Sequence, residues 1–188
     1  MFLLFVSTRA EWRDWLERHF ETDREVWLVS PKIISGKTRI PYNDLVEEAL
    51  CFGWIDSINK SLDAEHSMQR FSPRRPGSSY SQANIERLRW LAEHDLVHPS
   101  MEAAVKDLLG REYVFPADII GVIRQDEQAW KHFQAFPGAY RRIRIAYIDG
   151  ARDRPAEFAK RLNHFITQTR EKKMLAGYGG IEKYYPME

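Results

Sequence analysis

The stretch that decides the fold runs from Cys51 to Asn84 and reads CFGWIDSINKSLDAEHSMQRFSPRRPGSSYSQAN. Within it, residues 54–59 and 67–72 enclose a short polar connection, a pattern that predicts a β-hairpin. Residues 73–77 then contain two prolines and a glycine, which break regular structure. Residues 79–82 have the spacing of a capping box, the polar pair that starts many helices. The stretch therefore predicts two paired strands, a proline-framed loop and the start of a helix.

The chain before this stretch adds helices and short strands to the hairpin. Thr8 and Glu11 have capping-box spacing ahead of a helical apolar pattern, and a second helix is expected from a cap at Asn43 to a stop at Gly53. Three segments favour strands: residues 2–6, which also fit a hydrophobic lead-in, residues 26–29, and residues 38–40. Together with the hairpin, these segments predict a small sheet flanked by helices.

After the hairpin and its following helix, the pattern changes to helices and turns. Helical apolar spacing is present in four segments: residues 100–109, 118–123, 126–136 and 155–172. Residues 141–148 stay open between strand and helix. Their alternation allows a strand, whereas Tyr140, Ile143 and Tyr147 also fit one face of a helix.

These patterns predict an α+β fold in two parts. Residues 1–110 form an α+β domain with a small sheet flanked by helices, and residues 111–188 form a helical module. The tail 177–188 is rich in Gly and Tyr and is expected to be loosely packed.

Composition excludes several classes of protein. The 188 residues are 44% apolar and 13% aromatic, enough for a buried core, and the net charge of +1 argues against a bulk polyelectrolyte partner. A single cysteine, Cys51, excludes an internal disulfide and a multi-cysteine metal cluster. No apolar run approaches the roughly 20 residues that span a bilayer, and the short apolar N-terminus lacks the features of a secretory signal. The expected location is the cytoplasm.

Two groups of motifs carry a resemblance to a known family. The first consists of residues 45–56 (LVEEALCFGWID), residues 69–76 (QRFSPRRP) and the helix start at 81–84. The second is looser and consists of Pro116-Ala117-Asp118, Phe133, and Tyr147-Ile148 running into Ala151 and Arg161. Together they resemble the YdeI/OmpD-associated family of bacterial proteins, with its C-terminal bacteriocin-protection module.

The resemblance implies a modest functional expectation. The family is named for association with an outer-membrane porin and for protection against bacteriocins or cationic peptides, a form of stress resistance, and it implies no catalytic residues. Two positions depart from its pattern: Tyr80-Ser81 replaces the usual Trp-Ser, and Glu157-Phe158-Ala159 replaces the usual Glu-Thr-Arg. The second departure weakens any role that depends on an arginine at that point.

Asp56 is the one candidate for acid or base chemistry. It follows Trp54, and an aromatic neighbour can raise a carboxyl pKa toward the range that suits proton transfer. The alternative is structural, with Asp56 accepting hydrogen bonds from turn N–H groups or pairing with Arg70 across the hairpin.

Other reactive residues are interpreted as structural. Cys51 falls at the end of a helix, where the dipole opposes thiolate formation, so we expect a buried, inert thiol. His94 and His98 have metal-ligand spacing, but a third ligand is missing and Pro99 indicates that the helix has already ended. The sequence contains no nucleotide-binding, zinc-protease or serine-hydrolase motif. No cofactor and no metal are predicted.

An anion site is the main binding hypothesis. Its candidate residues lie in the proline-framed loop and the helix that follows: Arg70, Arg74, Arg75, Ser78, Ser81 and Asn84. Arginine binds phosphate or carboxylate through two parallel hydrogen bonds, and a helix start offers unpaired N–H groups. The alternative is that these arginines pair with nearby acids of the protein: Asp56, Asp63, Glu65 or Glu86.

A second basic region spans residues 139–173 and contains ten Lys and Arg residues against four Asp and Glu residues. Such a run is usually a solvated helix face, but it also suits a protein partner or another anionic surface. Nucleic-acid binding through Arg141 and Arg144 is disfavoured because no recognition motif accompanies the charge.

The leading functional hypothesis is a non-enzymatic binding protein. The alternative is an enzyme that acts on a small anionic substrate, with Arg74 and Arg75 holding the anion and Asp56 as acid or base.

Overall fold

The computed structural model describes residues 2–177, 179–182 and 184 and divides into two compact units. The first unit comprises Met1–Ser79 and Leu88–Leu109, and the second comprises Tyr80–Arg87 and Gly110–Glu188. Helix α3 (Gln82–Glu93) therefore gives its first half to the second unit and its second half to the first. The sequence-based division into two domains at residue 110 stays a prediction.

The first unit is built on a four-stranded sheet, so the predicted α+β class is confirmed. Its strands are β1 (Leu3–Phe5), β2 (Val26–Pro31), β3 (Trp54–Ser61) and β4 (His66–Pro73), in the order β1-β2-β4-β3. Strand β1 pairs parallel to β2, and the other pairs are antiparallel. The strand expected at residues 38–40 is wrong. A 3-10 turn, η1 (Ile33–Ser35), ends at Gly36 with φ of 66°, and the chain after it is irregular.

Three further helices belong to this unit: α1 (Arg9–His19), α2 (Tyr42–Cys51) and α4 (Pro99–Leu109). The predicted capping box of α1 is present, with Thr8 as the cap and Glu11 as its partner. The cap predicted at Asn43 is wrong, because α2 already begins at Tyr42 after Pro41. Gly53 follows α2 with φ of 72°, a left-handed conformation that glycine adopts at little cost.

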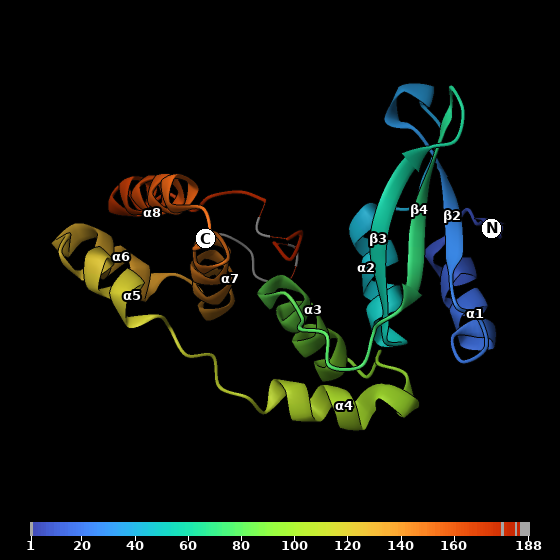
Figure 1. Ribbon diagram of the computed structural model, residues 1–188, viewed down its shortest axis with the longest axis horizontal. Helices are drawn as coiled ribbons and strands as arrows, with labels where there is room; N and C mark the ends of the chain where they lie inside the picture. Colours follow the sequence, from blue (N-terminus) through green and yellow to red (C-terminus); the bar gives the residue numbers. More distant parts are fainter. Residues whose placement is uncertain (1, 178, 183, 185–188) are drawn as a thin grey trace. The chain divides into compact units, whose positions relative to one another are not determined.

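Helices α1 and α2 lie along one end of the sheet, and the strands run on past them toward the β3–β4 turn (Figure 1). The core at this end is aromatic: Trp12 contacts Phe71 at a ring separation of 5.2 Å, and Trp15 contacts Trp54 at 5.8 Å. Burial of these large side chains is the main stabilising contribution of the unit.

Two buried acids of α2 are neutralised by arginines of α1. Glu47 and Glu48 are almost fully buried. Arg9 donates to both carboxylates, at 3.0 and 2.5 Å, and Arg13 donates to Glu48 at 2.8 Å. Because buried carboxylates are costly without charged partners, these contacts fix α1 against α2 and assign the paired glutamates a structural role.

The second unit is helical and contains α5 (Ala117–Arg124), α6 (Glu127–Ala135), α7 (Gly138–Asp149) and α8 (Pro155–Arg170). Residues 141–148, which the sequence left open, lie within α7. Tyr140, Ile143 and Ile148 face a core that includes Ile119 and Phe165. The helical spacing of apolar residues was therefore the correct guide here.

Part of the tail is packed. Ile181 is fully buried, and Arg87 donates a hydrogen bond to the Gly179 carbonyl. A Cβ at Gly179 would approach the Cβ of Ala83 to 2.6 Å, so only glycine allows this close approach. The remaining tail positions of the prediction, residues 178, 183 and 185–188, lie outside the described residues.

Candidate functional site

One face of the sheet changes from apolar to polar along its length. Near α1, Val26 of β2 lies opposite Phe71 of β4. Further along the same face, Leu28 pairs with Gln69, and Ser30 pairs with Ser67. Side chains at alternate positions share a face, so this face carries its polar groups where the sheet extends past the helices.

A β-bulge in β3 shapes this polar region. Asp56 pairs with Phe71 and Asn59 pairs with Gln69, so β3 advances by three residues while β4 advances by two. Residues three apart on a regular strand point to opposite faces. The extra residue at the bulge instead brings Asp56 and Asn59 to the same face, and bulges commonly redirect side chains in this way.

These polar side chains line a pocket of about 440 Å³. Its lining comes from the sheet, the start of α2 and the loop before α2: Ser30, Arg39, Ile40, Tyr42, Leu45, Asp56, Ser57, Asn59, Ser67 and Gln69. The Tyr42 hydroxyl donates to Asp56 at 2.5 Å, and the Asn59 amide donates to Gln69 at 3.0 Å. Arg39 is exposed and makes no ion pair with any described residue. The pocket thus combines one cation, one carboxylate and several neutral polar groups.

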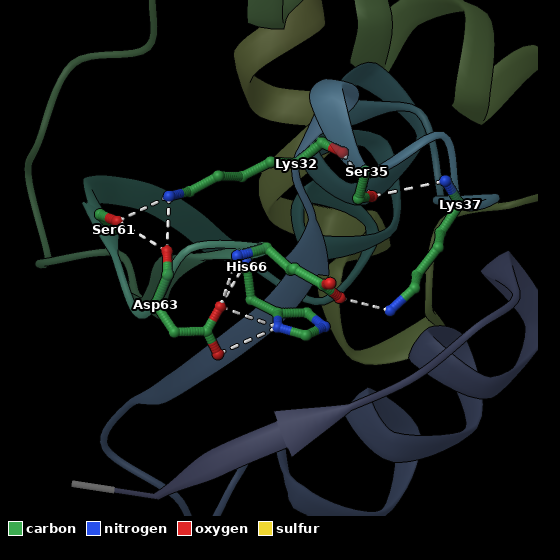
Figure 2. A network of polar contacts seen from close by, with 7 residues as sticks. Lys32, Ser35, Lys37, Ser61, Asp63 and His66 are labelled. Atoms are coloured by element: carbon green, nitrogen blue, oxygen red, sulfur yellow. Dashed lines mark hydrogen bonds and ion pairs between the residues drawn. The ribbon is translucent and has the colours of Figure 1, made fainter.

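A network at the far end of the sheet holds the loop that carries Arg39 (Figure 2). Lys32 donates to the Ser61 hydroxyl at 2.8 Å and to the Asp63 carbonyl at 2.6 Å, and Lys37 pairs with Glu65 at 2.6 Å. These bonds join the segment after β2 to the β3–β4 turn. They therefore hold the chain on both sides of η1, and Lys37 lies two residues before Arg39.

The turn itself is stabilised by Asp63. Its carboxylate accepts the backbone N–H groups of Glu65 and His66, each at 2.7 Å, and lies 3.0 Å from the His66 ring. The bond from the Glu65 N–H, with help from His66, lowers the pKa of Asp63. Lys37 likewise lowers the pKa of Glu65.

The structure places Asp56 in a different setting from either sequence alternative. It bonds to Tyr42 rather than to Arg70 or to turn N–H groups. Arg70 instead pairs with Glu25 at 2.8 Å and donates to the Ser57 hydroxyl at 3.2 Å. The arginine that shares a pocket with Asp56 is Arg39, which sequence reasoning missed because it lies 17 positions away in an irregular loop.

Three of the six members of the predicted anion site bond to residues close to them in the chain. Arg74 donates to the Ser78 and Ser79 carbonyls, at 3.5 and 2.6 Å. The Ser81 hydroxyl accepts the Asn84 N–H at 3.3 Å, which supplies the cap of α3.

The Asn84 side chain accepts a hydrogen bond from Arg87 at 2.7 Å, so it too is engaged locally. Arg75 and Ser78 have exposed side chains with no hydrogen bond among the described residues. Anion binding by this loop stays a prediction.

Cys51 and the two histidines have structural surroundings. Cys51 is fully buried, and burial, followed by the charge of Glu48, raises the pKa of its thiol to about 12. His94 bonds to the Trp90 carbonyl, whereas His98 bonds to Ser100 beyond the end of α3. In the described part of the chain, no three His, Cys, Asp or Glu residues come together to hold a metal ion.

A second pocket, of about 330 Å³, lies within the helical unit. It is lined by α7, α8 and the segment that follows α8: Arg144, Tyr147, Ile148, Glu157, Lys160, Arg161, His164, Phe165, Leu175 and Ala176. This lining differs from that of the sheet pocket because cations and apolar side chains dominate it.

The basic region at 139–173 is largely neutralised within its own unit. Arg142 makes a two-pronged pair with the buried Glu86, at 2.6 and 2.7 Å. Arg152 pairs in the same way with Asp118, at 2.9 Å for both bonds. Acids of the same unit therefore engage part of this basic region, and its binding to a protein partner or to nucleic acid stays a prediction.

Comparison with known protein families divides the chain in a similar way. Residues 4–104 match the family model described as Domain of unknown function (DUF8412). The chain belongs to this family. Residues 112–172 match the model described as Bacteriocin-protection, YdeI or OmpD-Associated (OmdA), which confirms the predicted family for the C-terminal module. No curated protein and no solved structure matches the chain.

The match boundaries place the two pockets in different family regions. Every lining residue of the sheet pocket lies within the DUF8412 match, as do the motifs at 45–56 and 69–76. The pocket of the helical unit has most of its lining within the OmdA match, apart from Leu175 and Ala176. None of the helices in the described ranges 2–177, 179–182 and 184 has the length and apolarity needed to span a bilayer.

Proposed function

We propose that the DUF8412 domain of this chain binds a small zwitterion, such as a free amino acid, in the sheet pocket. The observation that carries the proposal is the convergence of Arg39, Asp56 and a pair of carboxamides on one pocket. A volume of about 440 Å³ lies within the range of small-molecule sites, and a few convergent polar groups are what such sites use to orient a ligand.

The opposite charges of Arg39 and Asp56 determine which end of the zwitterion each residue would bind. Arg39 offers a guanidinium group, which binds a carboxylate through two parallel hydrogen bonds. Asp56 has one oxygen bonded to Tyr42 and a second oxygen available for an ammonium group. Asn59 and Gln69 supply further donors and acceptors in the same pocket.

The OmdA description supports a proposal for the biological role of this binding. That description names bacteriocin protection and OmpD association, and we propose that ligand binding by the N-terminal unit serves a protective response of this kind. The anion site predicted at residues 70–84 and the cytoplasmic location remain separate expectations within this proposal.

Isothermal titration with the common amino acids tests the proposal. We expect at least one zwitterion to bind, and we expect Arg39→Ala and Asp56→Asn each to weaken it about tenfold, since a charge-assisted hydrogen bond contributes roughly 1.5–3 kcal/mol. Arg24→Ala and Asp14→Asn are the matched controls, because both residues are exposed and lie outside the pocket.

Two outcomes would contradict binding of this kind. One is the absence of binding by every amino acid, and the other is equal affinity in the Arg39 variant and its Arg24 control. If the bound ligand is instead converted, and Asp56→Asn stops the conversion without preventing binding, the enzymatic alternative replaces the proposal.

A further inference from the structure

The pocket of the helical unit has two chemically distinct walls. Ile148 and Phe165 are almost fully buried in the unit's core and form an apolar wall together with Leu175. Lys160 and His164, one turn apart on α8, are exposed and form a polar rim. A ligand in this pocket therefore meets an apolar surface on one side and nitrogen-bearing side chains on the other.

Two arginines of the pocket are held in fixed positions. Arg144 is 8% exposed and donates to the Leu175 and Ala176 carbonyls, both at 2.6 Å. Arg161 pairs with Glu157 at 2.8 Å, donates to the Tyr147 carbonyl at 2.7 Å and lies 3.8 Å from the centre of the Tyr147 ring. Because these guanidinium groups are already ordered, they add positive potential to the pocket without a further entropy cost on binding.

The charges in the pocket do not cancel. Arg144, Lys160 and Arg161 are cations, and Glu157 is the one acid among the lining residues. Glu157 forms an ion pair with Arg161, and that pairing lowers the pKa of the Glu157 carboxyl group. Lys160 makes no hydrogen bond or ion pair with any described residue, although its charge contributes to the lowered pKa of Glu157, and its exposed side chain lines the pocket.

We infer that this pocket is a binding site for a small amphiphilic anion, a carboxylate or phosphate carried on a short apolar body. Lys160 and Arg161 bind the head group, and the wall of Ile148, Phe165 and Leu175 covers the apolar body. The volume of about 330 Å³ lies at the lower end of the range for small-molecule sites and suits a body of this size. The inference is independent of the zwitterion site in the N-terminal unit.

A set of six-carbon probes tests both halves of the inference. Hexanoate and hexyl phosphate carry the anion and the apolar body, acetate and inorganic phosphate carry the anion alone, and hexylammonium reverses the charge. We expect hexanoate to bind at least tenfold more tightly than acetate, since each buried methylene contributes roughly 0.8 kcal/mol. We expect hexylammonium not to bind. Comparison of hexanoate with hexyl phosphate then identifies the preferred head group.

Lys160→Ala locates the site. The lysine is exposed and makes no hydrogen bond or ion pair with any described residue, so we expect its removal to spare the fold and to lower the affinity for hexanoate about fivefold, as measured by isothermal titration calorimetry. Lys131→Ala is the matched control, because Lys131 is an exposed helical lysine of the same unit that lies outside the pocket. Equal affinity in the two variants, or binding of hexylammonium as tight as that of hexanoate, would overturn the inference.

Discussion

The two pockets of this protein differ in how their charges are balanced. The sheet pocket in the first unit holds one arginine and one aspartate among neutral polar side chains. The pocket of the helical unit holds three cations and one glutamate beside an apolar wall. The same chain thus presents a polar site of mixed charge in its DUF8412 domain and a cationic, partly apolar site in its OmdA module.

The difference has a structural origin. In the helical unit, Glu86 and Asp118 are bound by Arg142 and Arg152 away from the pocket, which leaves its remaining cations in excess. In the first unit, the acids that support the fold pair with α1, and Asp56 stays in the pocket with a hydroxyl partner. The division of acids between structural pairs and pockets therefore decides what each pocket can bind.

We expect the largest effect on the free energy of unfolding from a substitution that breaks the buried Arg142–Glu86 pair of the helical unit. Arg142→Ala removes the two hydrogen bonds that this arginine donates to Glu86, whose side chain is fully buried, so the carboxylate loses a two-pronged charged partner. Loss of one partner of a buried pair costs about 3 kcal/mol or more. We expect urea unfolding to show this loss for the variant.

Arg152→Ala is the control for that measurement. Its partner Asp118 is exposed, and exposed pairs contribute roughly 0–1 kcal/mol. If both variants lose the same stability, burial does not set the cost of removing an acid's arginine in this unit, and the proposed origin of the difference between the pockets fails.

We expect an intermediate effect on stability when two glycines, one in each unit, are changed to alanine. Gly53 has a left-handed φ of 72°, and a Cβ there would meet the Met101 Cε at 2.8 Å, so Gly53→Ala should destabilise by about 1–2 kcal/mol. Gly121 lies inside α5 with open space around it, so Gly121→Ala should stabilise by roughly 0.5–1 kcal/mol. Thermal unfolding that moves in the same direction for both variants would contradict this assignment.

We expect the smallest effect on stability from the titration of two exposed carboxyl groups, those of Asp118 and Asp63. Arg152 lowers the pKa of Asp118 to about 2, whereas the Glu65 N–H is the first cause of the lowered pKa of Asp63. Both groups therefore favour the folded state above their ordinary pKa of roughly 3.9, and this contribution is lost as the pH falls through the folded pKa.

The salt dependence of the two pKa values distinguishes the ion pair at Asp118 from the backbone hydrogen bond at Asp63. Screening at high ionic strength acts on exposed charge pairs, so NMR titration in 1 M salt should raise the pKa of Asp118 more than that of Asp63. Arg152→Ala should return the pKa of Asp118 toward its ordinary range and leave that of Asp63 in place. Equal responses to salt would show that the two carboxyl groups are held by the same kind of interaction.

The sequence predicted those features that depend on local patterns. The capping box at Thr8, the hairpin around residues 62–66 and the stop at Gly53 each follow from chemistry within a few residues, and each is present. The α+β class and the family of the C-terminal module were also correctly predicted. The prediction of a strand at 38–40 was wrong, because the chain turns at Gly36 in a left-handed conformation and continues as an irregular loop.

The sheet pocket could not be predicted in the same way. Its members come from strands and a loop that are distant in the sequence, and Asp56 shares a face with Asn59 because of a bulge that strand alternation does not reveal. Asp56 was recognised as a candidate, but its companions Tyr42 and Arg39 were not. One signal was available: Gln69 is a polar residue two positions from the apolar Phe71 on the same face of its strand, and a buried polar residue is an informative observation.

A crossed titration tests whether the two pockets bind ligands of different charge pattern. Wild type, Arg39→Ala and Lys160→Ala are each titrated with the best-binding amino acid and with hexanoate. We expect Arg39→Ala to lose affinity for the amino acid alone and Lys160→Ala to lose affinity for hexanoate alone. If either substitution weakens both ligands equally, or if neither substitution weakens either ligand, the account of two separate sites is contradicted.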